Sequence, residues 1–322
     1  MCRDDCRCLS MNYIHNNDRD NCELNDVNEQ MKPAALKYKP GASYYDLIRE
    51  YTNDHGTSFV LGRDHCINRC CWPNPCSNGG SCEEICDPTT VRFHCTCPAN
   101  YTGQRCEKIV RSCKGLATNG AKLSGMYRVY DSQNKSFQVY CDFDSEVGHV
   151  WTLMQSYSFG NNSHFDTKNF GVDFPVNQDA GAIKWVAYRL SLSRMLSIAN
   201  VSTHLRATCN FQDDGLVYTD YARAKLEGHN LFGTFKGTCR MYELVNIRGI
   251  ECRDCTALTR QTQDKMWYIN SYSTSKGCTF NGSEGSVQQE QNFGRYAYSN
   301  PEFRCTSNLN STTQHWIGSK LP

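Results

Sequence analysis

The chain has 322 residues, which is enough for two or three domains. Its formal net charge of +1 at pH 7 gives no electrostatic reason to expect nucleic acid or an anionic membrane as a partner. Cysteine is abundant, with 21 residues, which indicates a disulfide-stabilised protein of an oxidising, extracellular compartment. Because no uninterrupted apolar run approaches the roughly 20 residues needed to cross a bilayer, we predict no membrane span.

The chain opens with MCRDDCRCLS, which has no basic segment, apolar run or cleavage site of a secretory signal. A disulfide-rich chain needs such a signal, so we expect an N-terminally truncated copy of a secreted protein. Asn-x-Ser/Thr triplets support that expectation as candidate glycosylation sites. They lie at Asn100, Asn134, Asn161, Asn200, Asn281 and Asn310.

Residues 8–25 read CLSMNYIHNNDRDNCELN. Leu9, Met11 and Tyr13 alternate with polar residues, as expected for a strand with one buried face. The turn-forming stretch 16–18 then separates this strand from a second one that begins at Cys22. The C-x-S-x-N-Y and C-E-L-N pair resembles the PAN/apple module, a small α+β domain that we assign to residues 1–69.

The PAN/apple resemblance implies a helix before the first strand, whose remaining cysteine, Cys2, pairs with Cys8. The helical cysteine that would pair with Cys22 lies before Met1, and the resemblance assigns no partner to Cys6 or Cys66. The alternative is an arbitrary cysteine-rich leader.

A frame of six cysteines follows, with the spacing Cys71-x4-Cys76-x5-Cys82-x12-Cys95-x-Cys97-x8-Cys106. Zinc sites repeat closely spaced cysteine pairs or add paired histidines, which this frame does not. The order of spacings, with Asn78-Gly79-Gly80 and Phe93, resembles an EGF-like module over residues 70–107. About forty residues cannot build an adequate apolar core, so disulfides must stabilise this β module.

The EGF-like resemblance implies the pairs Cys71–Cys82, Cys76–Cys95 and Cys97–Cys106, with Cys70 and Cys86 as an additional pair. Residues 67–69 and Pro88 depart from the pattern of calcium-binding members, which argues against calcium. The string 76–82 resembles an O-fucosylation site with Ser81 as acceptor; alternatively, its glycines only form a turn.

From Ser112 the chain alternates apolar and polar residues in YRVY, FQVYCDF and VWTLM, which predicts antiparallel strands. The opening resembles fibrinogen-like domains, and that resemblance implies a Cys113–Cys141 bridge across the first two strands. We expect residues 108–322 to form one larger α+β domain with an antiparallel sheet, because its many aromatic residues can fill a single core.

Beyond residue 159 the resemblance fades. The pattern YRLSLSRMLSIA predicts a short helix at 188–199 that packs through Leu192, Met195 and Leu196. Strands are predicted in THLRATCNF, LVYTDYARAKL and RMYELVNIRGI. The string GHNLFG at 228–233 resembles the intelectins, but their sugar and calcium residues have no counterpart here. The even set of later cysteines predicts three structural disulfides rather than a redox C-x-x-C at 252–255; it comprises Cys209, Cys239, Cys252, Cys255, Cys278 and Cys305.

The sequence contains none of the G-x-S-x-G, H-E-x-x-H or glycine-rich phosphate motifs that support catalysis. We therefore expect no enzyme activity, no cofactor, and no metal site, because no Asp, Glu or His residues lie at ligand spacing. The three resemblances imply a secreted or matrix-associated binding or adhesion protein that recognises its partner through the C-terminal domain. In this reading the PAN and EGF-like modules are protein-binding spacers. The alternative is a glycan-binding defence lectin.

Overall fold

A computed structural model describes residues 10–14, 22–25, 33–46, 51–52, 58–59, 70–85, 92–272 and 277–321. The chain divides into two compact units, Met1–Lys108 and Ile109–Pro322. Each unit is described by itself.

The N-terminal unit opens with a three-stranded antiparallel sheet in the order β2-β1-β3. Strand β1 (Ser10–Ile14) pairs with β2 (Cys22–Asn25) and with β3 (Ala42–Asp46), and Met11 faces Leu24 in the register. The predicted pairing of the C-x-S-x-N-Y and C-E-L-N strands is confirmed. Cys2, Cys6, Cys8 and Cys66 lie outside the described residues, as does the side chain of Cys22.

The rest of this unit consists of short elements. The 3-10 helix η1 spans Pro33–Ala35, and β4 (Tyr51–Thr52) pairs with β5 (Ser58–Phe59). Strand β6 (Ser81–Glu84) pairs antiparallel with β7 (Phe93–Thr96), followed by β8 (Tyr101–Thr102) and β9 (Lys108–Ile109).

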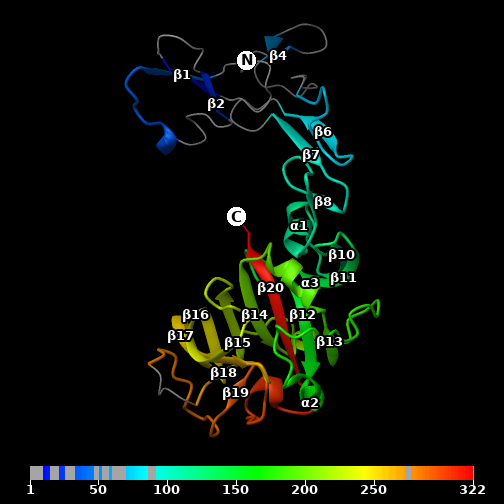
Figure 1. Cartoon of the computed structure of the whole chain (residues 1–322), viewed down its shortest axis with the longest axis vertical. Coiled ribbons are helices and arrows are strands. Elements are labelled where there is room, and N and C mark those ends of the chain that lie inside the picture. The colour runs from blue at the N-terminus through cyan, green and yellow to red at the C-terminus, as the bar shows by residue number, and fades with distance from the viewer. Residues whose placement is uncertain are drawn as a thin grey trace. The chain divides into compact units, whose positions relative to one another are not determined.

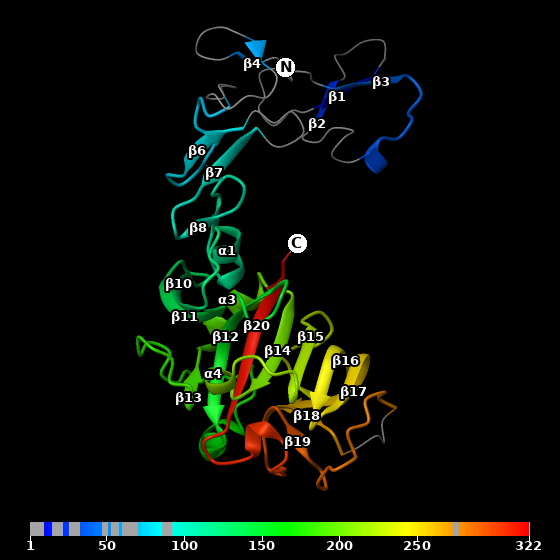
Figure 2. The same ribbon diagram turned by 180° about the vertical axis from the view of Figure 1, so that it is seen from behind.

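The C-terminal unit is built on an 11-stranded sheet. Its strands run in the order β10-β11-β12-β20-β14-β15-β16-β17-β18-β19, and β13 pairs with β12 (Figure 2). The strand bounds are β10 Gly125–Tyr130, β11 Ser136–Asp142, β12 His149–Ser158, β13 Ala187–Arg189, β14 His204–Cys209, β15 Tyr221–Lys225, β16 Phe235–Ile247, β17 Ile250–Thr262, β18 Lys265–Asn270, β19 Gln291–Asn292 and β20 Thr312–Lys320. The helix bounds are α1 Cys113–Thr118, η2 Phe159–Asn161, α2 Asn162–Phe165, α3 Leu192–Ala199, α4 Phe211–Asp214 and η3 Arg304–Thr306.

Strand β20, the last in the chain, lies between β12 and β14 in the middle of this sheet (Figure 1). Every residue of β12 is buried, as is every residue of β20 before Lys320. Around them one hydrophobic cluster gathers the buried side chains of the unit, including Trp151, Trp267 and Trp316. The predicted strands YRVY, FQVYCDF and VWTLM are confirmed as parts of β10, β11 and β12.

Two predictions for this unit need correction. Cys113 does bond Cys141, but Cys113 is the first residue of helix α1, so the bridge ties a helix to β11 rather than two strands together. The predicted helix at 188–199 begins only at Leu192, because residues 187–189 form β13 against β12. Of its expected packing residues Met195 is buried and Leu192 is half-buried, whereas Leu196 is 38% exposed; Ile198, which the pattern also allows on the apolar face, is buried.

Candidate functional site

The EGF-like segment is built around three disulfides. They join Cys71 with Cys82, Cys76 with Cys95, and Cys97 with Cys106, the pairs that the resemblance implies, with Cα separations of 5.3–5.7 Å. A small cluster of four buried residues, Cys70, Phe93, Cys95 and Cys106, completes its interior. Cys70 is disulfide-bonded, and its expected partner Cys86 lies outside the described residues. The segment therefore depends on covalent bridges rather than on an apolar core.

The glycine before Ser81 has a packing reason. A Cβ on Gly80 would lie 2.8 Å from Cys106 Sγ and 3.0 Å from Cys76 Cβ, so only glycine fits between the two bridges. Ser81 itself begins β6 with an exposed side chain. The structure thus gives the glycine pattern a structural cause and leaves the Ser81 hydroxyl open to a modifying enzyme.

The six candidate N-glycosylation sites differ in exposure. Asn134, Asn200, Asn281 and Asn310 are exposed, whereas Asn100 and Asn161 are half-buried. The amide of Asn161 donates to Ser158 Oγ at 3.0 Å and to the Val186 carbonyl at 2.9 Å. Both amide hydrogens of Asn161 are therefore used within the fold.

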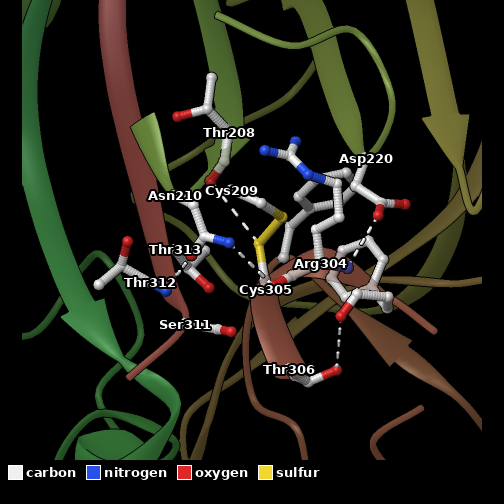
Figure 3. Close-up of a disulfide and its surroundings, with 12 residues drawn as sticks. Thr208, Cys209, Asn210, Asp220, Arg304, Cys305, Thr306, Ser311, Thr312 and Thr313 are labelled. Atoms are coloured by element: carbon white, nitrogen blue, oxygen red, sulfur yellow. Dashed lines mark hydrogen bonds between the residues drawn. A yellow bond between two sulfur atoms is a disulfide. The ribbon is translucent and has the colours of Figure 1, made fainter. Parts of the chain in front are cut away.

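A long segment between β18 and β20 is fastened to the sheet at both ends by disulfides. Cys278 bonds Cys239 of β16, and Cys305 of η3 bonds Cys209 at the end of β14. Figure 3 shows the second bridge and Asn210 next to it in sequence. Asn210 Nδ2 donates to the Arg304 carbonyl at 3.4 Å, and Asn210 Oδ1 accepts from the Thr312 amide at 2.7 Å. This contact ties the segment to the start of β20.

Buried carboxylates organise the same segment. Asp220 is fully buried and accepts a hydrogen bond from the backbone amide of Arg304 (Figure 3). It also accepts one from the backbone amide of Arg248. Burial raises the pKa of Asp220 despite those bonds. Glu290 is also fully buried and pairs with the Arg248 guanidinium. Arg248, in the turn between β16 and β17, therefore binds both carboxylates: its backbone amide donates to Asp220 and its guanidinium pairs with Glu290.

We call residues 285–300 the Glu290 lobe, because its backbone folds around that carboxylate. Glu290 accepts bonds from the Val287 amide at 3.1 Å and from Asn300 Nδ2 at 2.9 Å. Asn300 also donates to the Gly285 carbonyl at 2.9 Å, which closes the lobe. Val287 and Tyr298 are 36% and 46% exposed on it. A rigidly held loop that displays apolar and aromatic side chains is suited to binding a partner.

A second polar cluster lies inside the sheet region. Arg206 is 1% exposed and pairs with Asp142 and with Glu146 Oε2, the latter at 3.4 Å. Arg223 also forms an ion pair with Glu146, through Oε1. Glu146 in addition accepts a hydrogen bond from Trp151 Nε1 at 2.9 Å. Buried charges of this kind persist only when paired and hydrogen-bonded.

Two histidines and a glutamate border this cluster. His149, His204 and Glu243 each offer one ligand-type atom, and these atoms all lie within 4.8 Å of one another. Burial lowers the pKa of His149. Burial alone would raise the pKa of Glu243, but His204 and Arg223 hold it below its ordinary value. No spacing in the sequence points to this group, because its members come from β12, β14 and β16 and meet only in the folded sheet.

The C-x-x-C pair is joined as a disulfide between Cys252 and Cys255 within β17. Its surroundings are antiparallel strands β16 and β18, not the βαβ unit of a thioredoxin-like site. The six later cysteines therefore form three bridges, and the sequence offered no pairing for the two long-range ones, Cys209–Cys305 and Cys239–Cys278.

Comparison with known families identifies two regions. The family described as EGF-like domain matches residues 71–105. The family described as "Fibrinogen beta and gamma chains, C-terminal globular domain" matches residues 109–238. The chain thus contains an EGF-like domain and a fibrinogen-like domain. Domains of these two kinds are typically non-enzymatic, and neither of the two matched families is a catalytic one.

Curated relatives are similar over short stretches only. Delta-like protein 3 of Homo sapiens is 41% identical over 64 residues, which is 18% of this chain and 10% of that protein. Neural-cadherin of Drosophila melanogaster is 44% identical over 45 residues, 14% of this chain and 1% of that protein. Neurogenic locus notch homolog protein 1 of Mus musculus is 36% identical over 59 residues, 18% and 2% of the respective chains. The chain therefore spans a tenth or less of the length of these relatives.

The disulfides and the two matched domains fit an extracellular protein. Within the described residues, no helix has the length and apolar character that crossing a membrane requires.

Proposed function

We propose that the protein is an extracellular, non-enzymatic binding or adhesion protein that recognises its partner through the fibrinogen-like region. The observation that carries this proposal is the pairing of an EGF-like domain with a fibrinogen-like domain in one disulfide-rich chain. The relatives with EGF-like similarity include proteins named Delta-like, notch homolog and cadherin, which agrees with a role at cell surfaces or in the matrix. The EGF-like module then acts as a protein-binding spacer.

The Glu290 lobe is the recognition surface that we propose. Its backbone is fixed by a buried ion pair and by flanking disulfides, so binding costs little ordering of the loop. Tyr298 supplies a partly exposed aromatic group of the kind that anchors protein interfaces, and Val287 adds partly exposed apolar surface.

The domain division that we propose is 1–69, 70–107 and 108–322, with the first part a PAN/apple-like module. The antiparallel pairing of β1 with β2 supports that module, because these strands carry its two sequence motifs. The single hydrophobic cluster of the C-terminal unit supports treating everything after residue 107 as one domain.

A glycan-binding lectin has less support. Sugar recognition would need aromatic faces on display, yet the fibrinogen-like region buries most of its large aromatic side chains, among them Trp151, Trp267, Trp316, Tyr157, Tyr188, Tyr221, Tyr242 and Tyr296. Tyr298 and Tyr218, at 46% and 45% exposure, are among the few described candidates for stacking on a sugar.

The test is attachment of cells to surfaces coated with the full chain, run beside a glycan array with the same preparation. We expect attachment to the wild type and a loss of at least half of it in Val287→Ser/Tyr298→Ala. Leu123→Ser is the matched control, because Leu123 is 76% exposed and lies before β10, away from the lobe in sequence. Equal attachment of cells to all three proteins would mean that the recognition surface lies outside the Glu290 lobe. Glycan binding without attachment would favour the lectin.

A further inference from the structure

We propose that His149, His204 and Glu243 bind a divalent transition-metal ion, with zinc as the best match. Two imidazoles and one carboxylate form a ligand set that zinc takes in proteins, with a fourth position left to water or another ligand. Imidazole nitrogen disfavours Ca²⁺ and Mg²⁺, which prefer oxygen ligands throughout. None of the three residues belongs to the Glu290 lobe, and the choice of metal rests on their ligand atoms rather than on a family match.

One nitrogen of His149 has no role in the fold itself. His149 is 7% exposed, and its Nδ1 lies 3.3 Å from the Val147 carbonyl, an acceptor that places the ring proton on Nδ1. Its Nε2 is buried and lacks a hydrogen-bond partner. A buried, unpaired nitrogen lone pair is costly unless something binds it, and a metal ion would do so.

The other two ligands are oriented in the same way. His204 Nδ1 lies 2.7 Å from Thr203 Oγ1, and its Nε2 lies 3.3 Å from Glu243 Oε1. The remaining oxygen of Glu243, Oε2, accepts from Arg223 Nε at 2.9 Å. Each ligand thus uses one polar atom for an outer partner and leaves the other for the shared space, as in metal sites whose second shell fixes the ligands.

The distances suit zinc after a small adjustment. With zinc bond lengths near 2.0–2.1 Å, tetrahedral ligand atoms lie about 3.3–3.5 Å apart. The 3.3 Å between His204 and Glu243 already meets this value, and the upper limit of 4.8 Å within the group must shorten by roughly 1–1.5 Å. His149 is the first residue of β12 and follows Gly148, so its ring can make that movement.

Solvent can reach the site. A surface cavity of about 490 Å³ reaches His204, one of the three ligands, and is also lined by Thr203, Lys225 and Lys320. The Glu243 side chain is 26% exposed. An ion therefore has an entry path, which a usable site requires.

The experiment uses the full chain, treated with a chelator and dialysed, and titrated with ZnCl₂ in a calorimeter. We expect one equivalent of zinc to bind and to raise the melting temperature of the C-terminal unit by roughly 5 °C at saturating metal. His149→Phe keeps the stacking on Trp151, and His204→Asn keeps a donor to Thr203. Each should weaken zinc binding at least tenfold, whereas the exposed control His164→Asn should bind as the wild type does.

X-ray absorption at the zinc edge of the loaded wild type decides the ligand set without any variant. Two imidazoles with oxygen and no sulfur would support the assignment, and a sulfur ligand or a single imidazole would overturn it. Absence of stoichiometric zinc binding, an equal loss in His164→Asn, or preferential binding of CaCl₂ would overturn it as well.

Discussion

Replacing Arg206 with methionine tests whether the buried ion pairs of the sheet region hold the fold together. Methionine keeps most of the volume of the side chain and removes its charge. Asp142 and Glu146 are 1% and 3% exposed; Asp142 would lose the buried cation it pairs with, whereas Glu146 would keep its pair with Arg223. Arg206 also lies over the rings of Trp151 and Trp316, at 4.8 Å and 4.5 Å from their centroids. Both kinds of contact disappear together.

Breaking a buried ion pair on one side costs about 3–5 kcal/mol, because the remaining charge has no compensation. A buried cation–π contact adds about 1–2 kcal/mol. At roughly 2–4 °C per kcal/mol for a domain of this size, we expect Arg206→Met to lower the melting temperature by about 10 °C or more. Arg253→Met is the matched control, because the Arg253–Glu251 pair is 65% and 39% exposed and should contribute little.

The cost of Arg206→Met should also depend on pH. Burial alone would raise the pKa of Asp142, but Arg206 and the hydrogen bonds from Ser145 outweigh it and hold the pKa below its ordinary value. The wild-type pair therefore stabilises the fold above the unfolded pKa near 3.9 and loses that contribution as pH falls through the lower folded value. In the variant the carboxyl is buried without its cation and protonates more readily. The difference between the two proteins should therefore shrink between pH 7 and pH 3.

Denaturation followed by tryptophan fluorescence measures both effects, because Trp151 and Trp316 report on this cluster. A change below 1 kcal/mol, a change no larger than that of Arg253→Met, or a cost that is the same at pH 7 and pH 3 would refute the reasoning.

Three further predictions follow from buried groups and exposed turns. Gly318→Ala should lower the melting temperature by several degrees, because a Cβ there would lie 2.1 Å from the Val150 carbonyl and 2.5 Å from the Trp151 ring; a calorimetric scan equal to wild type would contradict this. Burial lowers the pKa of His315 to about 3, so its neutral ring contributes fully to the free energy of unfolding above pH 6.5, and this contribution falls as pH drops towards 3. In denaturant titrations at several pH values, His315→Gln should show a flatter dependence of stability on pH than the wild type. In protein secreted from animal cells, mass spectrometry should detect glycans at Asn134, Asn200, Asn281 and Asn310, which are exposed. It should find Asn161 unmodified, because the side-chain amide of Asn161 is hydrogen-bonded within the fold.

The sequence could predict what depends on local pattern. Alternation located β10, β11 and β12, because this signal lies within the strands themselves. The spacing of six cysteines indicated an EGF-like module, and the resemblance to that family implied the pairs that the structure has. Local pattern misplaced Leu196. Periodicity gives a helix one apolar stripe, but only the neighbouring strand decides which part of the stripe is covered, and Ile198 is covered instead.

Contacts between distant segments could not be predicted. The Cys209–Cys305 bridge spans 96 residues, and no pattern near either cysteine points to the other. Glu290 looks like an ordinary polar loop residue in sequence, yet it is fully buried because Arg248 and Asn300 reach it. The His149, His204 and Glu243 group forms only when β12, β14 and β16 take their places in the sheet.

The position of β20 shows that the folded unit extends beyond the family match. The match ends at residue 238, early in β16, whereas β12 and β14 are joined only through β20, which begins at Thr312. Without β20 the buried edges of β12 and β14 would present unpaired backbone groups, which are costly away from water. The stretch after residue 238 lies outside that match yet supplies the strand that the matched part requires. The sheet that holds β12 and β14 together is therefore completed by a part of the chain that the family match does not cover, the same part that carries the Glu290 lobe.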